Sequence, residues 1–468
     1  MRRREVGGQN LPRERPVRQR RGAGAVREGD SGDRNPVLNS TPRRRASVPT
    51  PRPVPAATAH PSTRCASFPP PPVNRSERLL ALDVFRGLTV AGMLLVNNPG
   101  SWGAIFPPLA HAPWHGWTPT DLIFPFFLFI VGITTHLSLT TRRARGDDTA
   151  ALTRQVLKRG ALIFLCGLTL NWFPGWSWGT TGELADATWP ERVVHRLEHL
   201  RIMGVLQRIG LAYLLGGLLT IRLGVRGQLV ALATLLFGYW ALMTLVPVPG
   251  TGQLGYALLD EPSQVLSAWL DRAVIGEAHL YSGAKTWDPE GLLSTLPAVG
   301  NVLLGVLAGR WIAARERALT DRLSALFAVG ALGMMVGLCW HWVFPINKSL
   351  WTSSYVVFTS GMAAVTLATC LWLIDVQQWR GWTRFFVVYG TNPLLAFMGS
   401  GVMARLTVSI ITWIEDGKRV SLQAAVHKAL FLSWLPPKPA SLAYALSFVL
   451  LWYVILAALH RRGIVVKV

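Results

Sequence analysis

The chain is poor in cysteine, and the few cysteines that it has argue against two classes of protein. Its 468 residues hold four cysteines and no CxxC pair. They are Cys65, Cys166, Cys339 and Cys370, of which the last three lie in apolar runs. This pattern predicts small core residues, and neither a disulfide-stabilised domain nor a cysteine-based metal site.

Acidic residues are also scarce, with 25 Asp and Glu against 47 Lys and Arg, which gives a formal net charge of +22. About half of this excess lies in 1–76, where 16 Arg face 5 acidic residues. We expect a disordered basic tail over 1–76 and a membrane domain over 77–468, because the tail is too polar to fold. Contact with anionic lipid, or a start site placed too early, explains such a tail better than nucleic-acid binding does. No apolar run precedes the arginines, so no signal peptide is expected.

Long apolar runs make up most of the remaining chain. Half of all residues are hydrophobic and 20 are Trp, which is typical of an integral membrane protein. About 20 apolar residues cross a bilayer, so the sequence predicts an all-α polytopic membrane protein with about ten transmembrane helices. The ten stretches are 79–97, 119–140, 156–173, 203–221, 227–246, 293–312, 323–343, 354–374, 384–409 and 441–459.

The positions of Lys and Arg indicate the direction of these spans. Cations gather in alternate connections, which the positive-inside rule places in the cytoplasm. They are Arg142, Arg143, Arg145, Arg154, Lys158, Arg159, Arg222, Arg226, Arg310, Arg315, Arg317, Arg322, Arg380, Arg384, Arg461, Arg462 and Lys467. The connection 98–118 has none. We therefore expect an integral protein of the cell (inner) membrane, with both termini cytoplasmic and 98–118 extracytoplasmic.

Two histidines stand in that outer connection, in "HAPWHGW". His111 and His115 are four residues apart, but Pro113 and Gly116 oppose the helix that a metal-binding pair would need, and no metal is expected. The alternatives are a structural histidine in a Trp-rich loop, or a general base or nucleophile, which needs a carboxylate or carbonyl partner.

Few polar side chains interrupt the spans, and a membrane helix tolerates them where they face a cavity or a partner. Asp83 and Arg86 share a helix face, which suits an interfacial ion pair or a contact for an anionic cofactor. Arg208 either reaches the interface or faces a cavity with Gln207. We expect one outer layer of polar residues with two asparagines beneath it. The layer is Asn97, His111, His115, Asp121, Gln207, Arg208 and Lys348, and the asparagines are Asn301 and Asn392.

Six motifs occur in the order in which they stand in a known family. They are "LLALDVFRGLTVAGMLLVNNPG", "HAPWHGWTPTDLIFPFFLFIVG", "RIMGVLQRIGLAY", "WDPEGLLSTLPAVGNVLLGVLAGRW", "PINKSLWTSSYVVFTSG" and "GTNPLLAF". The chain thereby resembles the heparan-α-glucosaminide N-acetyltransferase family of transmembrane acyltransferases, over residues 78 to about 400. The resemblance implies a transferase that uses acetyl-CoA from the cytoplasm to acetylate an amino sugar across the membrane.

The same resemblance implies roles for particular residues. His111 matches the histidine of the family's active site and Asn97 matches an asparagine that precedes it. With Asp121 as the partner of His111, these three are the expected catalytic residues. Contacts to the CoA donor are expected from Arg86, Gln207, Arg208, Lys348, Asn301 and Asn392. The expected acceptor is an amine or hydroxyl of an extracytoplasmic saccharide, and a homodimer is compatible with the sequence.

A multi-pass transporter of an envelope precursor or metabolite is the alternative function. Buried Asn, Gln and Arg side chains and a helix broken near Asn392, where Gly390 and Pro393 interrupt the span, suit a transporter as well. Release of the CoA thiol distinguishes the two functions, because a transporter does not consume CoA.

Overall fold

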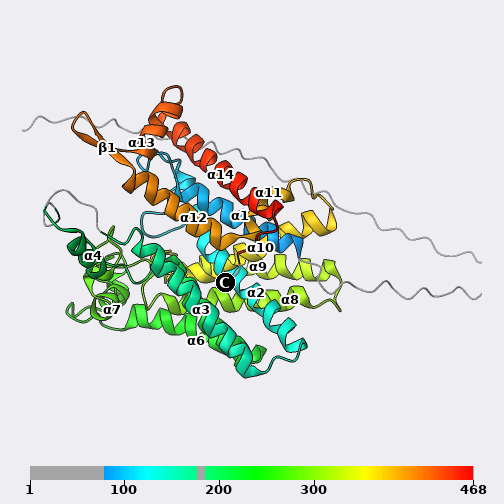
Figure 1. Ribbon diagram of the computed structural model, residues 1–468. Coiled ribbons are helices and arrows are strands. Elements are labelled where there is room, and N and C mark those ends of the chain that lie inside the picture. Colours follow the sequence, from blue (N-terminus) through cyan, green and yellow to red (C-terminus); the bar gives the residue numbers. More distant parts are fainter. Residues whose placement is uncertain (1–78, 177–183, 185, 467–468) are drawn as a thin grey trace, which may run out of the picture. The chain divides into compact units, whose positions relative to one another are not determined.

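The computed structural model of the protein describes residues 79–176, 184 and 186–466 (Figure 1). The expected disordered tail over 1–76, with Cys65, lies outside the described residues, as does Lys467. The described part consists of helices, short helical turns and one β-hairpin.

The helices are of two kinds. The long ones are α1 (Leu80–Asn97), α2 (Ile123–Ala144), α3 (Thr149–Trp172), α5 (Val205–Arg222), α6 (Val225–Leu245), α8 (Thr295–Ala313), α9 (Leu319–Trp340), α10 (Ser353–Leu371), α12 (Pro393–Arg405) and α14 (Pro437–Arg461). The short ones are α4 (Trp189–Glu198), α7 (Leu266–Val274), α11 (Thr383–Thr391) and α13 (Leu422–His427). The 3-10 turns are η1 (Pro107–Leu109), η2 (Pro119–Leu122), η4 (Gly255–Leu258) and η5 (Glu277–His279), and the π-helical turns are η6 (Trp372–Val376), η7 (Leu406–Ile410) and η8 (Lys428–Leu432).

The hairpin is a small departure from the all-α prediction. It pairs β1 (Thr412–Glu415) with β2 (Lys418–Ser421) in antiparallel register. Asp416 and Gly417 form its turn, both with positive φ, the conformation that an Asp-Gly pair adopts most readily. This local turn chemistry explains why two short strands form here.

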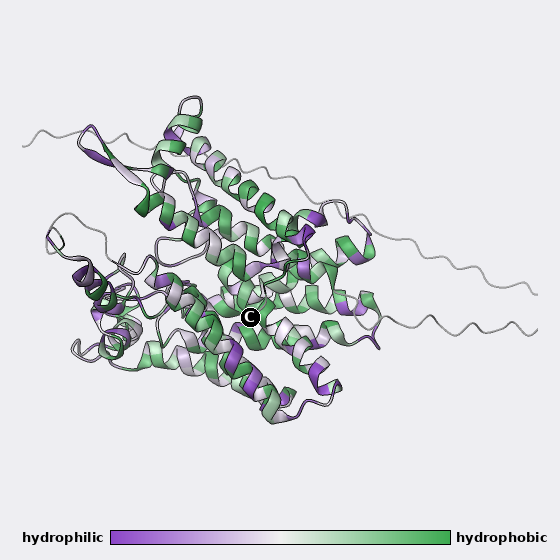
Figure 2. Ribbon diagram, in the orientation of Figure 1, coloured by the Kyte–Doolittle hydropathy of each residue, from purple (hydrophilic) through white to green (hydrophobic). Residues whose placement is uncertain are grey.

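Nine helices within the described residues are long and apolar enough to cross a membrane. Figure 2 shows the apolar residues running along helices such as α6, α9 and α14, with polar residues gathered in the connections. The predicted class of all-α polytopic membrane protein is therefore confirmed.

The predicted span 156–173 is the one that falls outside these nine. It lies in α3, which begins earlier, at Thr149, and carries Arg154, Lys158 and Arg159 in its first half. α3 nevertheless runs antiparallel along α5, since Gly167 packs against Gln207 and Gly160 packs against Gly210. It therefore passes through the bundle beside α5 even though its charges lower its apolarity.

Glycines allow a close helix contact between α2 and α8. A Cβ atom on Gly132 would collide with the carbonyl oxygen of Val302, and one on Gly305 with the carbonyl oxygen of Phe129. Small residues at such crossings let two backbones approach, as is common between membrane helices. This crossing fixes α2, which begins at Ile123, two residues after Asp121.

The connections that the sequence places outside meet at one end of the bundle. The Gly116 amide donates to the carbonyl oxygen of Ile346 at 2.7 Å, and Trp114 Nε1 donates to that of Leu259 at 2.8 Å. At the other end of α2, an Arg143 guanidinium nitrogen donates to the carbonyl oxygen of Ile221. The basic connections after α2 and α5 therefore share the opposite end.

The predicted span 384–409 is broken, as its Gly and Pro indicated. Asn392 separates α11 from α12, and Pro393 is the first residue of α12. The Asn392 side chain bonds the C-terminal segment, donating to the carbonyl oxygen of Ile464 at 3.1 Å and accepting from the Val466 amide at 2.8 Å. Asn392 thus lies beside the chain that follows α14.

Candidate active site

A histidine–carboxylate pair lies at the end of the bundle where the connections predicted to be extracytoplasmic meet, hereafter the outer end. His111 Nδ1 lies 2.6 Å from Asp121 Oδ1, and only 1% of Asp121 is exposed. The other carboxylate oxygen of Asp121 accepts from the amides of Ala112 and Thr118, each at 3.0 Å. Asp121 closes the turn that begins at Thr118, so the same carboxylate fixes both the loop and the imidazole.

The pairing determines which nitrogen of His111 is available for reaction. A carboxylate that accepts from Nδ1–H keeps the proton on Nδ1 and leaves the lone pair on Nε2. Tyr355 steadies the same residue from α10, since its hydroxyl donates to the Asp121 carbonyl oxygen at 2.5 Å. His111 is therefore oriented as a general base requires.

Lys348 lies over the imidazole. Its Nζ is 3.0 Å from Nδ1 and 3.1 Å from Nε2 of His111, and 3.7 Å from Asp121 Oδ1. Nearly equal distances to both ring nitrogens place the ammonium over the ring face and not in line with a lone pair. Burial lowers the pKa of Lys348, although Asp121 and Glu290 oppose that shift. The Lys348 side chain thus lies against both His111 and Asp121.

His115 is turned away from this pair. Its Nδ1 accepts from the side-chain amide of Asn347 at 3.2 Å, and its Nε2 contacts the exposed carboxylate of Asp260 at 2.9 Å. Burial lowers the pKa of His115. These contacts make it part of the loop framework. No group of three or more His, Cys, Asp or Glu within the described ranges is arranged to hold a metal ion.

A cavity of about 350 Å³ opens beside the pair, hereafter the outer cavity. Its wall includes the three expected catalytic residues, His111, Asn97 and Asp121, together with Lys348. The wall is otherwise rich in aromatic side chains: Trp114, Phe124, Phe127, Tyr281, Trp287 and Phe397. Such a mixture of aromatic surface and a few polar groups is typical of a small-molecule site.

A second cavity of about 410 Å³, hereafter the inner cavity, extends toward the basic end. Its cations are Arg86 from α1 and Arg159 from α3, and its wall includes Thr391 and Val466. Four side chains line both cavities: Met93, Phe127, Val205 and Phe397. The two cavities therefore adjoin within the bundle.

Four of the residues expected at the donor site line neither cavity. Arg208 is fully buried, donates to the Gly291 carbonyl and Ser294, and stacks on Trp351. Gln207 packs against α3 at Gly167.

Asn301, the third, donates to Ser360 at 2.8 Å and accepts from Trp351 Nε1 at 2.9 Å. Asn392 bonds the C-terminal segment and follows Gly390, whose carbonyl oxygen accepts from Arg86, so it lies at the inner-cavity end and not below the outer layer. A role for these four in donor binding stays a prediction.

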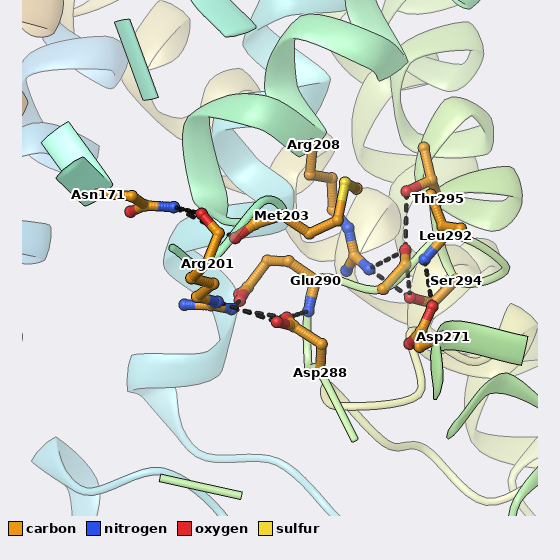
Figure 3. Close-up of polar contacts among 11 residues, drawn as sticks. Asn171, Arg201, Met203, Arg208, Asp271, Asp288, Glu290, Leu292, Ser294 and Thr295 are labelled. Atoms are coloured by element: carbon orange, nitrogen blue, oxygen red, sulfur yellow. Dashed lines mark hydrogen bonds and ion pairs between the residues drawn. The ribbon is translucent and has the colours of Figure 1, made fainter. Parts of the chain in front are cut away.

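A cluster of charged residues at the outer end was not predicted from the sequence (Figure 3). Arg201 donates to both carboxylate oxygens of Asp288, at 2.9 and 2.6 Å, and to Glu290 at 2.5 Å. Burial disfavours the charge of Arg201, but these carboxylates outweigh burial and raise its pKa. Arg201 and Glu290 line the outer cavity. The signal was the "WDPEG" motif, which places two acids directly before an apolar span.

The fold and the site define a polytopic membrane protein with a histidine–aspartate pair above two adjoining cavities. A family model described as "Heparan-alpha-glucosaminide N-acetyltransferase, catalytic" matches residues 78–339. The human protein named heparan-alpha-glucosaminide N-acetyltransferase is 30% identical over 372 residues, covering 69% of this chain and 53% of the relative. The mouse protein of that name is 28% identical over 375 residues, covering 70% and 54%.

The chain belongs to this catalytic family, and the resemblance of its motifs is confirmed. It spans about half the length of the curated relatives that it matches.

Proposed function

We propose that this chain transfers an acetyl, or related short acyl, group from acetyl-CoA to an amine or hydroxyl of an extracytoplasmic saccharide. The observation that carries the proposal is the pair of adjoining cavities with His111 in the wall of one and two arginines in the wall of the other. One cavity suits an anionic donor and the other suits a polar acceptor. Membership of the acetyltransferase family supports the choice of donor.

In this proposal His111 is the general base. Nε2 accepts the proton of the acceptor amine or hydroxyl as that atom attacks the acetyl carbon. The carbon–sulfur bond breaks, and the proton passes to the CoA sulfur, so that the products are the acetylated acceptor and the free thiol. Lys348 and Asn97, both in the same wall, donate to the carbonyl oxygen as negative charge develops on it.

The donor enters from the end that carries the arginines. Arg86 and Arg159 attract the anionic phosphates, and the acyl end extends past the four side chains that both cavities share. From Arg86 to Asn97, α1 rises about 16 Å, so the donor is bound extended. Direct transfer requires both substrates at once, and adjoining cavities allow that.

The proposed orientation follows from the loops. The connections rich in Arg and Lys lie at the inner-cavity end, which the positive-inside rule places in the cytoplasm. The outer cavity then faces the extracytoplasmic side of the cell (inner) membrane, and both termini are cytoplasmic. This arrangement brings a cytoplasmic donor to an acceptor across the membrane.

The test is a thiol-release assay with the purified full-length chain in detergent. Acetyl-CoA alone, acceptor alone and both together are compared, with a panel of amino sugars and neutral sugars as acceptors. We expect CoA thiol to appear with both substrates and to match the acetylated product mole for mole. A chain that binds neither acetyl-CoA nor acceptor, and releases no thiol, would overturn the proposal.

The broken helix at Asn392 and the adjoining cavities also suit the alternative, a transporter. Proteoliposomes separate the two functions. A transporter accumulates its substrate without thiol release, whereas the proposed enzyme releases thiol in proportion to the acetylated acceptor.

A further inference from the structure

Trp351 stands three residues after Lys348, in a backbone conformation that a bulky residue rarely adopts. Its φ is 54°, in the left-handed region, and only 1% of the residue is exposed. That region is sterically unfavourable for a large side chain, so the surrounding structure must hold the residue there. Trp351 lines neither cavity and has no part in the reaction described above.

The left-handed residue closes the turn that carries Lys348. The Trp351 amide donates to the Lys348 carbonyl oxygen at 3.1 Å, and the Leu350 amide donates to the Asn347 side chain at 2.9 Å. The backbone amide of Asn347 in turn donates to the Thr352 hydroxyl at 3.0 Å. These bonds join both ends of the turn, so the direction in which the Lys348 side chain leaves the backbone depends on the conformation of Trp351.

Two polar groups from other helices hold the indole ring of Trp351. Asn301 of α8 accepts from Nε1 at 2.9 Å, and the Arg208 guanidinium of α5 lies 4.9 Å from the ring centroid. Arg208 is itself held by the Gly291 carbonyl oxygen, at 3.2 Å, and by Ser294 (Figure 3). A hydrogen bond and a cation–π contact, both buried, therefore fix the ring of this strained residue.

Two aromatic contacts connect the same ring with the surroundings of Asp121. Phe124, which lines the outer cavity three residues after Asp121, packs on Trp351 with ring centroids 4.7 Å apart. Tyr355, whose hydroxyl donates to the Asp121 carbonyl oxygen, packs edge to face on the indole at 5.2 Å. The turn is thereby placed relative to α2, which begins beside Asp121.

The place of the Lys348 ammonium depends on such support. A lysine side chain has many conformations, so the contacts of Lys348 with His111 and Asp121 require its Cα atom to be fixed. A shift of about 1 Å at a reacting group costs up to about 10²-fold in rate. A device that fixes the turn is therefore a device that acts on the reaction.

We infer that Trp351 is a positioning residue, which acts on the reaction through Lys348. Its indole, held by Asn301 and Arg208, fixes the turn that presents the Lys348 ammonium to the acetyl carbonyl oxygen. The inference rests on the proposed function, in which Lys348 donates to that oxygen. It gives Asn301 and Arg208 a role that does not require contact with the donor.

The first experiment is a double-mutant cycle on the purified full-length chain, with CoA-thiol release as the readout. Trp351→Phe keeps an aromatic ring for Arg208 but removes the N–H group that Asn301 accepts. We expect kcat to fall about 10-fold, with the KM for acetyl-CoA within about threefold, because the inner cavity is intact. Lys348→Ala lowers kcat about 100-fold. Adding Trp351→Phe to it changes kcat less than about twofold, since Trp351 acts through Lys348.

A second measurement follows the Lys348 amine directly and needs no turnover. Trace acetic anhydride labels only the free amine, so the labelling rate of Lys348 against pH, measured by peptide mass spectrometry, gives its pKa. In wild type this pKa lies below the ordinary lysine value, because the amine is buried. In Trp351→Phe the amine moves toward solvent, so we expect its pKa to rise toward the ordinary value.

Trp452→Phe is the matched control. Trp452 is also buried in a membrane helix, but its Nε1 has no hydrogen-bond partner among the described residues, so the change removes no such bond. It leaves both kcat and the Lys348 pKa unchanged. If the melting curve in detergent shows that Trp351→Phe does not fold, Asn301→Ala removes the same hydrogen bond and is assayed in its place.

Additive losses of kcat in the double variant overturn the inference, as does an unchanged kcat or an unchanged Lys348 pKa in a folded Trp351→Phe. Each of these results leaves the acetyltransferase proposal intact if wild type releases thiol. Failure of wild type to release thiol with any acceptor contradicts the proposed function itself. The Lys348 titration then still tests whether Trp351 positions the amine, so the two failures are distinguishable.

Discussion

Nδ1 of His111 and Oδ1 of Asp121 are 2.6 Å apart, although one residue belongs to an irregular outer loop and the other to the turn that starts a membrane helix. The carboxylate is held by two backbone amides of the same loop, so it cannot turn away when the imidazole takes up a proton. Contacts around this end of the bundle lead to two predictions about catalysis and one about stability, and the inner cavity leads to one about donor binding.

His111→Ala is expected to lower kcat at least 10³-fold, because it removes the group that accepts the proton of the acceptor. The Kd for acetyl-CoA changes less than threefold, since the inner cavity is intact. Thiol release and equilibrium binding of acetyl-CoA measure the two effects. His115→Ala is the control, because His115 contacts Asn347 and Asp260 and does not line the cavity. A larger loss of kcat in the control than in His111→Ala would contradict the assignment.

Asp121→Asn is expected to lower kcat by about 10²- to 10⁴-fold with little change in KM. The amide keeps one oxygen for the Ala112 and Thr118 amides but no longer holds Nδ1–H, so the imidazole loses its orientation and tautomer. Steady-state kinetics measure the effect, and the detergent melting temperature checks that the loop is folded. Full activity in Asp121→Asn would show that the 2.6 Å contact is only structural.

The sequence predicts the membrane fold well because long apolar runs and cations at alternate ends are local signals. The break between Gly390 and Pro393 is predicted by these two residues themselves. The proximity of His111, Asp121 and Lys348 is predicted by the loops and span ends that the cations place on one side. The start of α3 is harder to predict, since its charged first turns, from Thr149, lie before the predicted apolar span 156–173.

Long-range contacts explain why the surroundings of other residues could not be predicted from the sequence. The sequence predicts that Arg208 contacts the CoA donor, because burying an unpaired arginine is costly. In the fold its partners are the Gly291 carbonyl and Ser294, more than 80 positions away. Glu290 was overlooked because an acid in a loop before a span looks solvated. Only the fold shows that Arg201 binds its carboxylate and that it shares the wall of the outer cavity with aromatic side chains.

Arg159→Gln is expected to raise the KM for acetyl-CoA about tenfold with kcat nearly unchanged, because Arg159 lines the inner cavity and binds the donor before any bond changes. The effect shrinks as salt is added, since salt screens the attraction to phosphates. Arg310→Gln removes a cation from an exposed position at the same end without touching the cavity, and serves as the matched control. An equal rise in the KM for acetyl-CoA in both variants would mean that the basic end attracts the donor only through its overall charge.

The stability of the protein is expected to fall as pH rises toward and through 7, because of Asp271. Burial raises the pKa of this carboxyl to about 7, so between about pH 4 and 7 the folded protein holds a proton that the unfolded chain releases. The free energy of unfolding therefore decreases with pH across that window, by up to about 4 kcal/mol, since each pKa unit corresponds to about 1.4 kcal/mol. Melting temperatures in detergent at pH 5, 6, 7 and 8 measure the decline.

Asp271→Asn isolates this contribution from those of other titrating groups. Asparagine keeps an oxygen for the Leu292 amide but has no charge to bury, so the melting temperature of the variant declines less between pH 5 and 8. The advantage of the variant over wild type thus grows as pH rises, and is largest at pH 8, where wild type carries a buried carboxylate. Parallel declines in the two proteins would place the titration elsewhere, and a decline confined to low pH would reverse the sign predicted from the raised pKa.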